Sequence, residues 1–203
     1  MKTSCLLPPL CLLAAARIAL AQGTFIFDQQ SSDESRILEG AAFIQQSQPI
    51  GQSFTPMLTS VGFIRLDIYN GVLGNTSPAT LHINLRADSI TGPVIGVSES
   101  VLIPGGALFS APVDFLFLVP PSVVPGQTYY FQPLVENNDN LGLSQSSYGY
   151  AGGTAFFWGQ PDRLDRDLWF REGIVVPEPT TGVLALVAIA VFARRGRARR
   201  RDP

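Results

Sequence analysis

The sequence predicts an all-β protein: an antiparallel β-sandwich, jelly-roll-like, between an N-terminal signal peptide and a single short C-terminal transmembrane helix. Three observations lead to this fold class. Apolar and polar residues alternate with a period of two, Gly- and Pro-rich turns recur at near-regular spacing, and residues 22–176 show no sustained helical period. We therefore divide the chain into 1–21, 22–176 and 177–203.

The first 21 residues have the composition of a secretory signal peptide. Lys2 precedes an apolar stretch, and Ala19-Leu20-Ala21 offers small residues for cleavage before Gln22. The apolar stretch is shorter than the ~20 residues that a spanning helix needs, which favours removal over retention. Cys5 and Cys11 are the only cysteines, so the mature chain is expected to have no disulfide and no thiol chemistry.

The first half of the body contains four predicted strands. Thr24–Asp28 and Gly51–Thr55 are short apolar stretches, and Ser31–Ile50 between them is expected to be irregular. In Val61–Tyr69 the isoleucines and leucine share one face, and Arg65 and Asp67 share a wet face. Ala79–Asp88 has the clearest alternation of apolar and polar residues.

The second half contains the other six. A Thr-Gly-Pro turn leads into a strand at Val94–Ser98. Val113–Val119 and Tyr129–Val135 are apolar on both faces, which indicates central strands. The last three predicted strands are Gly142–Ser147, Thr154–Trp158 and Asp167–Val175. Trp169 and Phe170 point to opposite faces of the last one, so we expect only one of them in the core.

Charge divides the body from the tail. Residues 22–176 hold six arginines and no lysine against nine aspartates and five glutamates, a formal charge of −8. An acidic body repels nucleic acid, so we expect no nucleic-acid partner. The arginines of the tail are Arg194, Arg195, Arg197, Arg199, Arg200 and Arg201.

The C-terminal segment combines three features in a fixed order. Pro177-Glu178-Pro179 is followed by an apolar run at 182–193 and then by the arginine cluster at 194–201. Prolines keep the triplet extended and accessible. A helix over the apolar run measures about 18 Å at ~1.5 Å per residue, short of the ~30 Å hydrocarbon core. The arginines are expected to stay on the cytoplasmic side, as a cytoplasmic anchor.

This order resembles the sorting signal of PEP-CTERM proteins of Gram-negative bacteria. The resemblance implies that a membrane protease-transpeptidase, exosortase, recognises Pro177, Glu178 and Pro179 and removes the helix. It also implies a transient stay in the inner membrane, followed by the cell surface or the extracellular space. An ordinary tail anchor that is never cut is the alternative.

The body is similar to a recurrent kind of exported β-sandwich with carbohydrate-binding-module-like architecture. The similarity covers about residues 50–172, and its motifs are mainly turn and core residues. These motifs are Ile50-Gly51-Gln52-Ser53-Phe54-Thr55, Pro125-Gly126-Gln127-Thr128-Tyr129-Tyr130, Tyr150-Ala151-Gly152-Gly153 and Asp167-Leu168-Trp169-Phe170-Arg171. The resemblance therefore implies a fold more than a function.

Catalytic patterns are sparse in this sequence. His82 is the only histidine, on the wet face of a predicted strand, and no Gly-x-Ser-x-Gly or phosphate-binding loop motif occurs. Asp162, Asp165 and Asp167 could supply paired carboxylates for glycoside hydrolysis. They alternate with arginines, however, which indicates charge neutralisation on a loop. We expect a protein without catalytic residues.

Two binding hypotheses remain. Glu136, Asn138, Asp139 and Asn140 crowd oxygen ligands into one loop, which favours calcium as a cofactor, with Asp114 or Asp162 as further ligands. Tyr148, Tyr150 and Trp158 could form an aromatic platform for sugar rings beside Asn138 and Asn140. The alternatives are loop chemistry for the first group and core packing for the second.

The function expected from these patterns is that of an exported, non-catalytic surface or extracellular-matrix protein that binds extracellular polysaccharide. A secreted glycan hydrolase and a purely structural element of a polymer layer are the alternatives. The expected processing partners are signal peptidase and exosortase.

Overall fold

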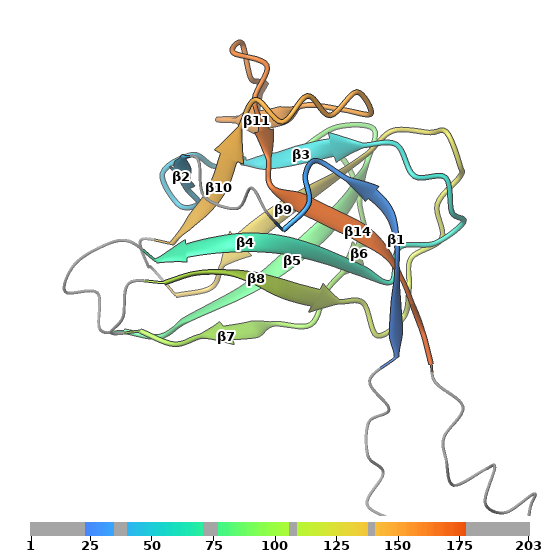
Figure 1. Ribbon diagram of the computed structural model, residues 1–203, viewed down its shortest axis with the longest axis horizontal. Coiled ribbons are helices and arrows are strands. Elements are labelled where there is room, and N and C mark those ends of the chain that lie inside the picture. Colours follow the sequence, from blue (N-terminus) through green and yellow to red (C-terminus); the bar gives the residue numbers. More distant parts are fainter. Residues whose placement is uncertain (1–22, 35–39, 71–76, 106–108, 138–140, 178–203) are drawn as a thin grey trace, which may run out of the picture. The chain divides into compact units, whose positions relative to one another are not determined.

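Figure 1 shows the computed structural model, which describes residues 23–34, 40–70, 77–105, 109–137 and 141–177. These residues form strands, turns and loops but no helix, so the all-β prediction is confirmed for them. The predicted leader at 1–21, the apolar run at 182–193 and the arginine tail lie outside the described residues. Among the residues that are described, there is no helix long and apolar enough to cross a membrane.

The strands form two antiparallel sheets. The first sheet contains, in order, β1 (Thr24–Gln30), β14 (Phe170–Val176), β4 (Phe63–Asn70), β10 (Gly142–Ser146) and β13 (Asp167–Leu168), with β8 (Phe109–Leu116) paired to β4 and β2 (Ala41–Phe43) paired to β10. The second contains β12 (Gln160–Pro161), β11 (Ala155–Phe157), β3 (Gly51–Phe54), β9 (Tyr129–Val135), β5 (Ala79–Ala87) and β6 (Val94–Val97), with β7 (Val101–Ile103) paired to β5.

The inner faces of both sheets supply one core. Alternation in β5 turns Leu81, Ile83 and Leu85 inward, and all three are fully buried. Phe131 of the second sheet meets Phe170 of the first at a centroid distance of 5.3 Å. Ring contacts of this kind between the sheets exclude water from a large apolar area, which makes the pair of sheets a β-sandwich.

The two strands predicted to be central have different positions. β9 lies between β3 and β5, which confirms the prediction. β8 pairs only with β4 among the described strands and ends at Leu116, so the prediction of a central strand over Val113–Val119 is wrong. Pro120 and Pro121 follow and cannot donate to a strand ladder. Leu118 and Val119 are consequently exposed.

The outer face of the first sheet is more buried than its sequence indicates. Asp67, predicted to be wet, is fully buried, because Ser110 and Ser144 donate hydrogen bonds to its carboxylate. Trp169 and Phe170 are both buried, but only Phe170 belongs to the core cluster between the sheets, as expected. The indole Nε1 of Trp169 donates to the carbonyl oxygen of Asp33 at 2.9 Å, which shows that the chain after β1 covers this face.

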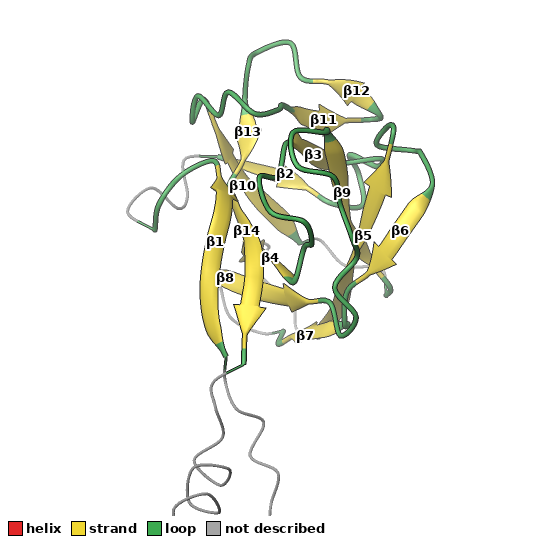
Figure 2. Cartoon of the chain, turned by 90° about the vertical axis from the view of Figure 1, so that its right-hand side faces the viewer, coloured by secondary structure: helices red, strands yellow, loops and turns green. Residues whose placement is uncertain are grey.

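The ends of the sandwich have distinct roles. β1 and β14 pair antiparallel with Thr24 opposite Val176, so the chain enters and leaves the domain at one end. The hairpin of β11 and β12 lies at the opposite end, as Figures 1 and 2 both show. The first and last residues of the sandwich, Thr24 and Val176, therefore lie at the end away from this hairpin.

Candidate functional site

The most unusual exposed side chain belongs to the β11–β12 hairpin. Phe157 pairs with Gln160, which leaves Trp158 and Gly159 as a two-residue loop. Both have positive φ, 53° and 73°, the combination found in a type I′ turn. Asn, Asp and Gly normally occupy such positions because a bulky L-residue meets its own backbone there.

Neighbouring segments fix the conformation of Trp158. Its backbone N–H donates to the carbonyl oxygen of Ser47 at 2.8 Å. Its indole Nε1 donates to the carbonyl oxygen of Gln46 at 2.9 Å, and its ring lies 6.3 Å from that of Phe157. The side chain nevertheless remains 67% exposed. The result is an oriented aromatic surface open to solvent.

This arrangement costs stability. A non-glycine residue in the left-handed region costs on the order of 1 kcal/mol. Two-thirds of the indole remains exposed, so most of its apolar surface gains nothing from folding. A strained, exposed and oriented tryptophan is a candidate for contact with a ligand.

The predicted tyrosine partners of Trp158 do not stand beside it as free rings. The hydroxyl of Tyr150 accepts a hydrogen bond from the Thr55 N–H at 3.4 Å and donates to Gln29 Oε1 at 3.0 Å. Its ring packs edge-on against Phe170, and burial raises its pKa to about 12. Tyr150 thus lines the core. Tyr148 is half-buried after β10, and Asn138 and Asn140 lie outside the described residues.

The aspartates considered for hydrolysis have separate structural roles. Asp162 accepts hydrogen bonds from the backbone N–H groups of Leu164 and Arg166 and a two-pronged pair from the Arg166 guanidinium. This guanidinium is the main reason that the pKa of Asp162 falls to about 2. Asp162 is therefore ionised at neutral pH and cannot act as a general acid there.

The other two aspartates differ from Asp162 and from each other. Asp167 is buried and accepts hydrogen bonds from Gln52 Nε2 and the Tyr150 N–H. Asp165 is exposed and has a φ of 52°. Because one carboxylate is buried, one is held by arginine and one faces solvent, the three do not form an acid–base pair.

The described part of the predicted calcium loop is already occupied by protein hydrogen bonds. Glu136 Oε1 accepts from Ser100 Oγ at 2.5 Å and contacts His82 Nδ1 at 3.0 Å. These contacts, Ser100 first, lower the pKa of Glu136. Asp114 and Asp162, the other suggested ligands, are paired with arginines. Asn138, Asp139 and Asn140 lie outside the described residues.

No metal-binding cluster is present in the described ranges. They contain no group of three or more His, Cys, Asp or Glu side chains placed to hold a metal ion. The calcium hypothesis therefore depends on residues 138–140.

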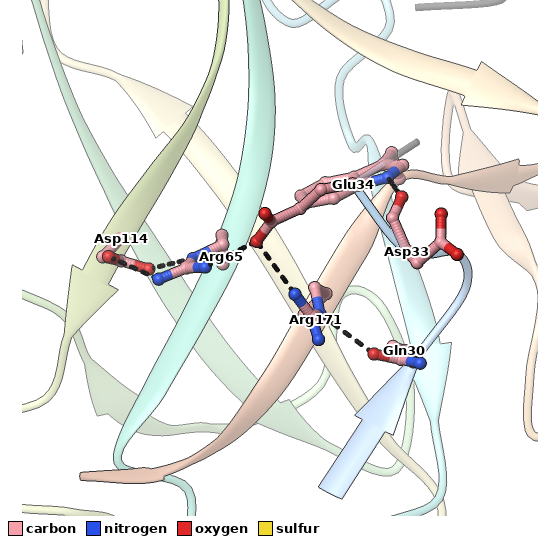
Figure 3. A network of polar contacts seen from close by, with 7 residues as sticks. Gln30, Asp33, Glu34, Arg65, Asp114 and Arg171 are labelled. Atoms are coloured by element: carbon pink, nitrogen blue, oxygen red, sulfur yellow. Dashed lines mark hydrogen bonds and ion pairs between the residues drawn. The ribbon is translucent and has the colours of Figure 1, made fainter. Parts of the chain in front are cut away.

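Charged side chains on the first sheet form a connected network (Figure 3). Glu34 accepts hydrogen bonds from Arg65 at 3.0 Å and from Arg171 at 2.9 Å. Arg65 also donates two hydrogen bonds, from Nε and Nη2, to the carboxylate of Asp114. Arg171 lies 3.6 Å above the ring of Phe27. Both guanidinium groups thus have carboxylate partners, and we interpret the network as a clamp across β8, β4 and β14.

Only one residue of the predicted sorting motif is described. Pro177 is exposed and directly follows β14. Glu178, Pro179 and the six arginines of the tail lie outside the described residues.

No protein-family model matches the chain, and no curated protein matches it significantly.

Proposed function

We propose that this chain is an exported, non-catalytic surface or extracellular-matrix protein whose β-sandwich contacts polysaccharide through Trp158. The leader at 1–21 and the PEP-CTERM-like tail at 177–203 support export, inner-membrane anchoring and release by exosortase. We retain the jelly-roll assignment as a prediction in the same proposal, together with calcium binding at the 136–140 loop.

The state of Trp158 is the observation that carries the proposal. Sugar rings stack their apolar C–H faces on exposed aromatic rings, and an indole offers the largest such area. A ring that its own hydrogen bond already holds in place loses less conformational entropy on binding than a free one. The polar Gln160 beside it in the hairpin is exposed and can hydrogen-bond sugar hydroxyls.

The position of the hairpin supports the same function. Because the chain enters and leaves at the opposite end of the sandwich, a domain tethered through its terminus presents Trp158 away from the tether. The alternative of a glycan hydrolase is less well supported, since Asp162 is held as an ion pair.

A polysaccharide pull-down tests this function. Full-length protein in detergent is incubated with insoluble or immobilised extracellular polysaccharides, and the bound fraction is measured. We expect at least one polysaccharide to retain the wild type, with Trp158→Ala reducing retention at least tenfold. Leu164→Ala, which removes an exposed apolar side chain of the next loop, is the matched control and should bind normally. Equal retention of wild type and Trp158→Ala would contradict the proposal.

A further inference from the structure

Glu172 is a fully buried carboxyl group in the strand that leads to the terminus. It lies in β14, opposite Gln29 of β1 on one side and Ile64 of β4 on the other. Its exposure is 0%, and neither carboxyl oxygen forms a hydrogen bond of good geometry, although the Gln29 backbone and the Asp28 side chain are its polar contacts. Leaving an ionised carboxylate in this position without a partner would carry a large desolvation cost.

A second carboxyl group, that of Asp28, interacts with Glu172, and its charge makes that cost larger. Asp28 occupies the bulge between β1 and β14, where the register shifts between Phe27 and Gln29. Its Oδ2 accepts hydrogen bonds from the backbone N–H groups of Met57 and Leu58 at 2.7 and 2.9 Å. These two amide hydrogen bonds fix the position of the Asp28 side chain. Its negative charge then disfavours a second charge on Glu172.

Among the described residues around Glu172, no cationic side chain offsets its repulsion from Asp28. Arg171 precedes it in β14 and therefore points to the opposite face of the sheet, where it and Arg65 bind Glu34. Tyr150, from the segment after β10, also interacts electrostatically with Glu172, and its backbone N–H donates to Asp167 of β13. The β4 neighbour Ile64 is apolar. No cationic group of the described ranges therefore acts on Glu172.

We propose that Glu172 and Asp28 hold one proton between them in the folded domain, and that this proton strengthens the pairing of β1 with β14. A carboxylic acid can donate to the Asp28 carboxylate, so one proton converts a repulsive pair into a hydrogen bond across the two strands. A proton suits the site better than a metal ion, because calcium needs six to eight oxygen ligands and Asp28 Oδ2 is already taken by two amides.

The consequence is a domain that is more stable in acid. Burial, followed by the charge of Asp28, raises the pKa of Glu172 from 4.5 to about 9. The folded protein therefore keeps a proton that the unfolded chain releases above pH 4.5. Because the native state binds more protons, stability is full below pH 4.5 and declines as pH rises towards 9. The decline loosens β1 from β14, the pair of strands that adjoins both exits of the domain.

Chemical denaturation across pH 5–9 tests the proposal. The measurement uses the full chain in detergent. Because the folded state keeps the Glu172 proton and the unfolded chain releases it, we expect the folding equilibrium constant to fall by up to about tenfold per pH unit as pH rises. Glu172→Gln retains an amide donor for Asp28 but cannot ionise. Its plot of folding free energy against pH should therefore lack the part of the slope that one bound proton contributes. Glu34→Gln, which neutralises an exposed carboxylate on the other face, should keep the wild-type slope.

Infrared spectroscopy keeps the test informative if a variant folds poorly. The wild type at pH 7 should show the stretching band of a protonated carboxyl group, which disappears above pH 9. Parallel slopes for wild type and Glu172→Gln, or no such band at pH 7, would overturn the proposal. Loss of the wild-type slope on adding millimolar calcium would also overturn it, since the bound cation would then be a metal ion.

Discussion

The two tryptophans have opposite roles at the scale of single residues. Trp158 is two-thirds exposed in a left-handed turn, whereas Trp169 is buried and bonded to the chain after β1. Asparagine is preferred where φ is positive in a type I′ turn. We therefore expect Trp158→Asn to change the free energy of unfolding by less than about 1 kcal/mol, and Trp169→Ala to lower it by about 3–5 kcal/mol. Urea denaturation measures both, and a severe loss in Trp158→Asn would mean that the indole serves folding.

Tyr150 tests whether the aromatic site is confined to Trp158. Its hydroxyl joins Thr55 to Gln29, and Tyr150→Phe leaves both without this partner. We expect a loss of about 1–3 kcal/mol in the free energy of unfolding, with polysaccharide retention unchanged. Reduced retention at unchanged stability would instead assign Tyr150 to the binding surface.

At the scale of elements, the approach of β1 to β14 depends on one glycine. A Cβ at Gly173 would lie 1.9 Å from the carbonyl oxygen of Ile26. We expect Gly173→Ala to cost about 1–3 kcal/mol or more, because backbone must move. Gly142 in β10 is the control, since a Cβ there meets its nearest neighbours at 3.4 Å. Equal thermal denaturation midpoints for Gly173→Ala and Gly142→Ala would show that the two strands can separate freely.

The loop between β12 and β13 has its own pH dependence. The Arg166 guanidinium and backbone amides lower the pKa of Asp162 from 3.8 to about 2. A depressed pKa stabilises the folded state above pH 3.8, and this contribution is lost as pH falls through 2. We expect denaturation to steepen between pH 4 and pH 2 in the wild type and to be flatter in Asp162→Asn. Identical acid titrations of the two proteins would contradict the role given to this ion pair.

Sequence patterns predict the strands whose signal is local. β5 alternates over nine residues and was found with nearly correct bounds, while β2, β7 and β12 have two or three residues each and exist through pairing with distant strands. Asp67 shares a predicted wet face with Arg65, and Glu172 directly follows Arg171. Their burial depends on segments far away in sequence: Ser110 and Ser144 contact Asp67, and the bulge at Asp28 lies beside Glu172. The turn conformation of Trp158 likewise required the register of β11 with β12.

The whole molecule combines opposing pH effects. The buried carboxyl groups have pKa values that are raised, chiefly by burial; they belong to Asp67, Asp167 and Glu172. A raised pKa makes the folded state more stable at acidic pH. Asp162 acts in the opposite direction, because its lowered pKa makes the folded state more stable when this carboxylate is ionised. We therefore expect maximal stability of the wild type on the acidic side of neutrality, measured as the denaturation midpoint across pH 3–9. A maximum above pH 7 would show that the buried carboxyls are ionised in the folded protein.

We propose that the leader and the tail are removed and that a sandwich with Trp158 at its far end is delivered outside the cell. Intact-mass spectrometry of the protein recovered from its host tests this most directly. We predict a species in the extracellular or surface fraction that begins at Gln22 and ends at or near the 177–179 triplet. Recovery of the uncut 203-residue polypeptide from the soluble cytosol would contradict the account.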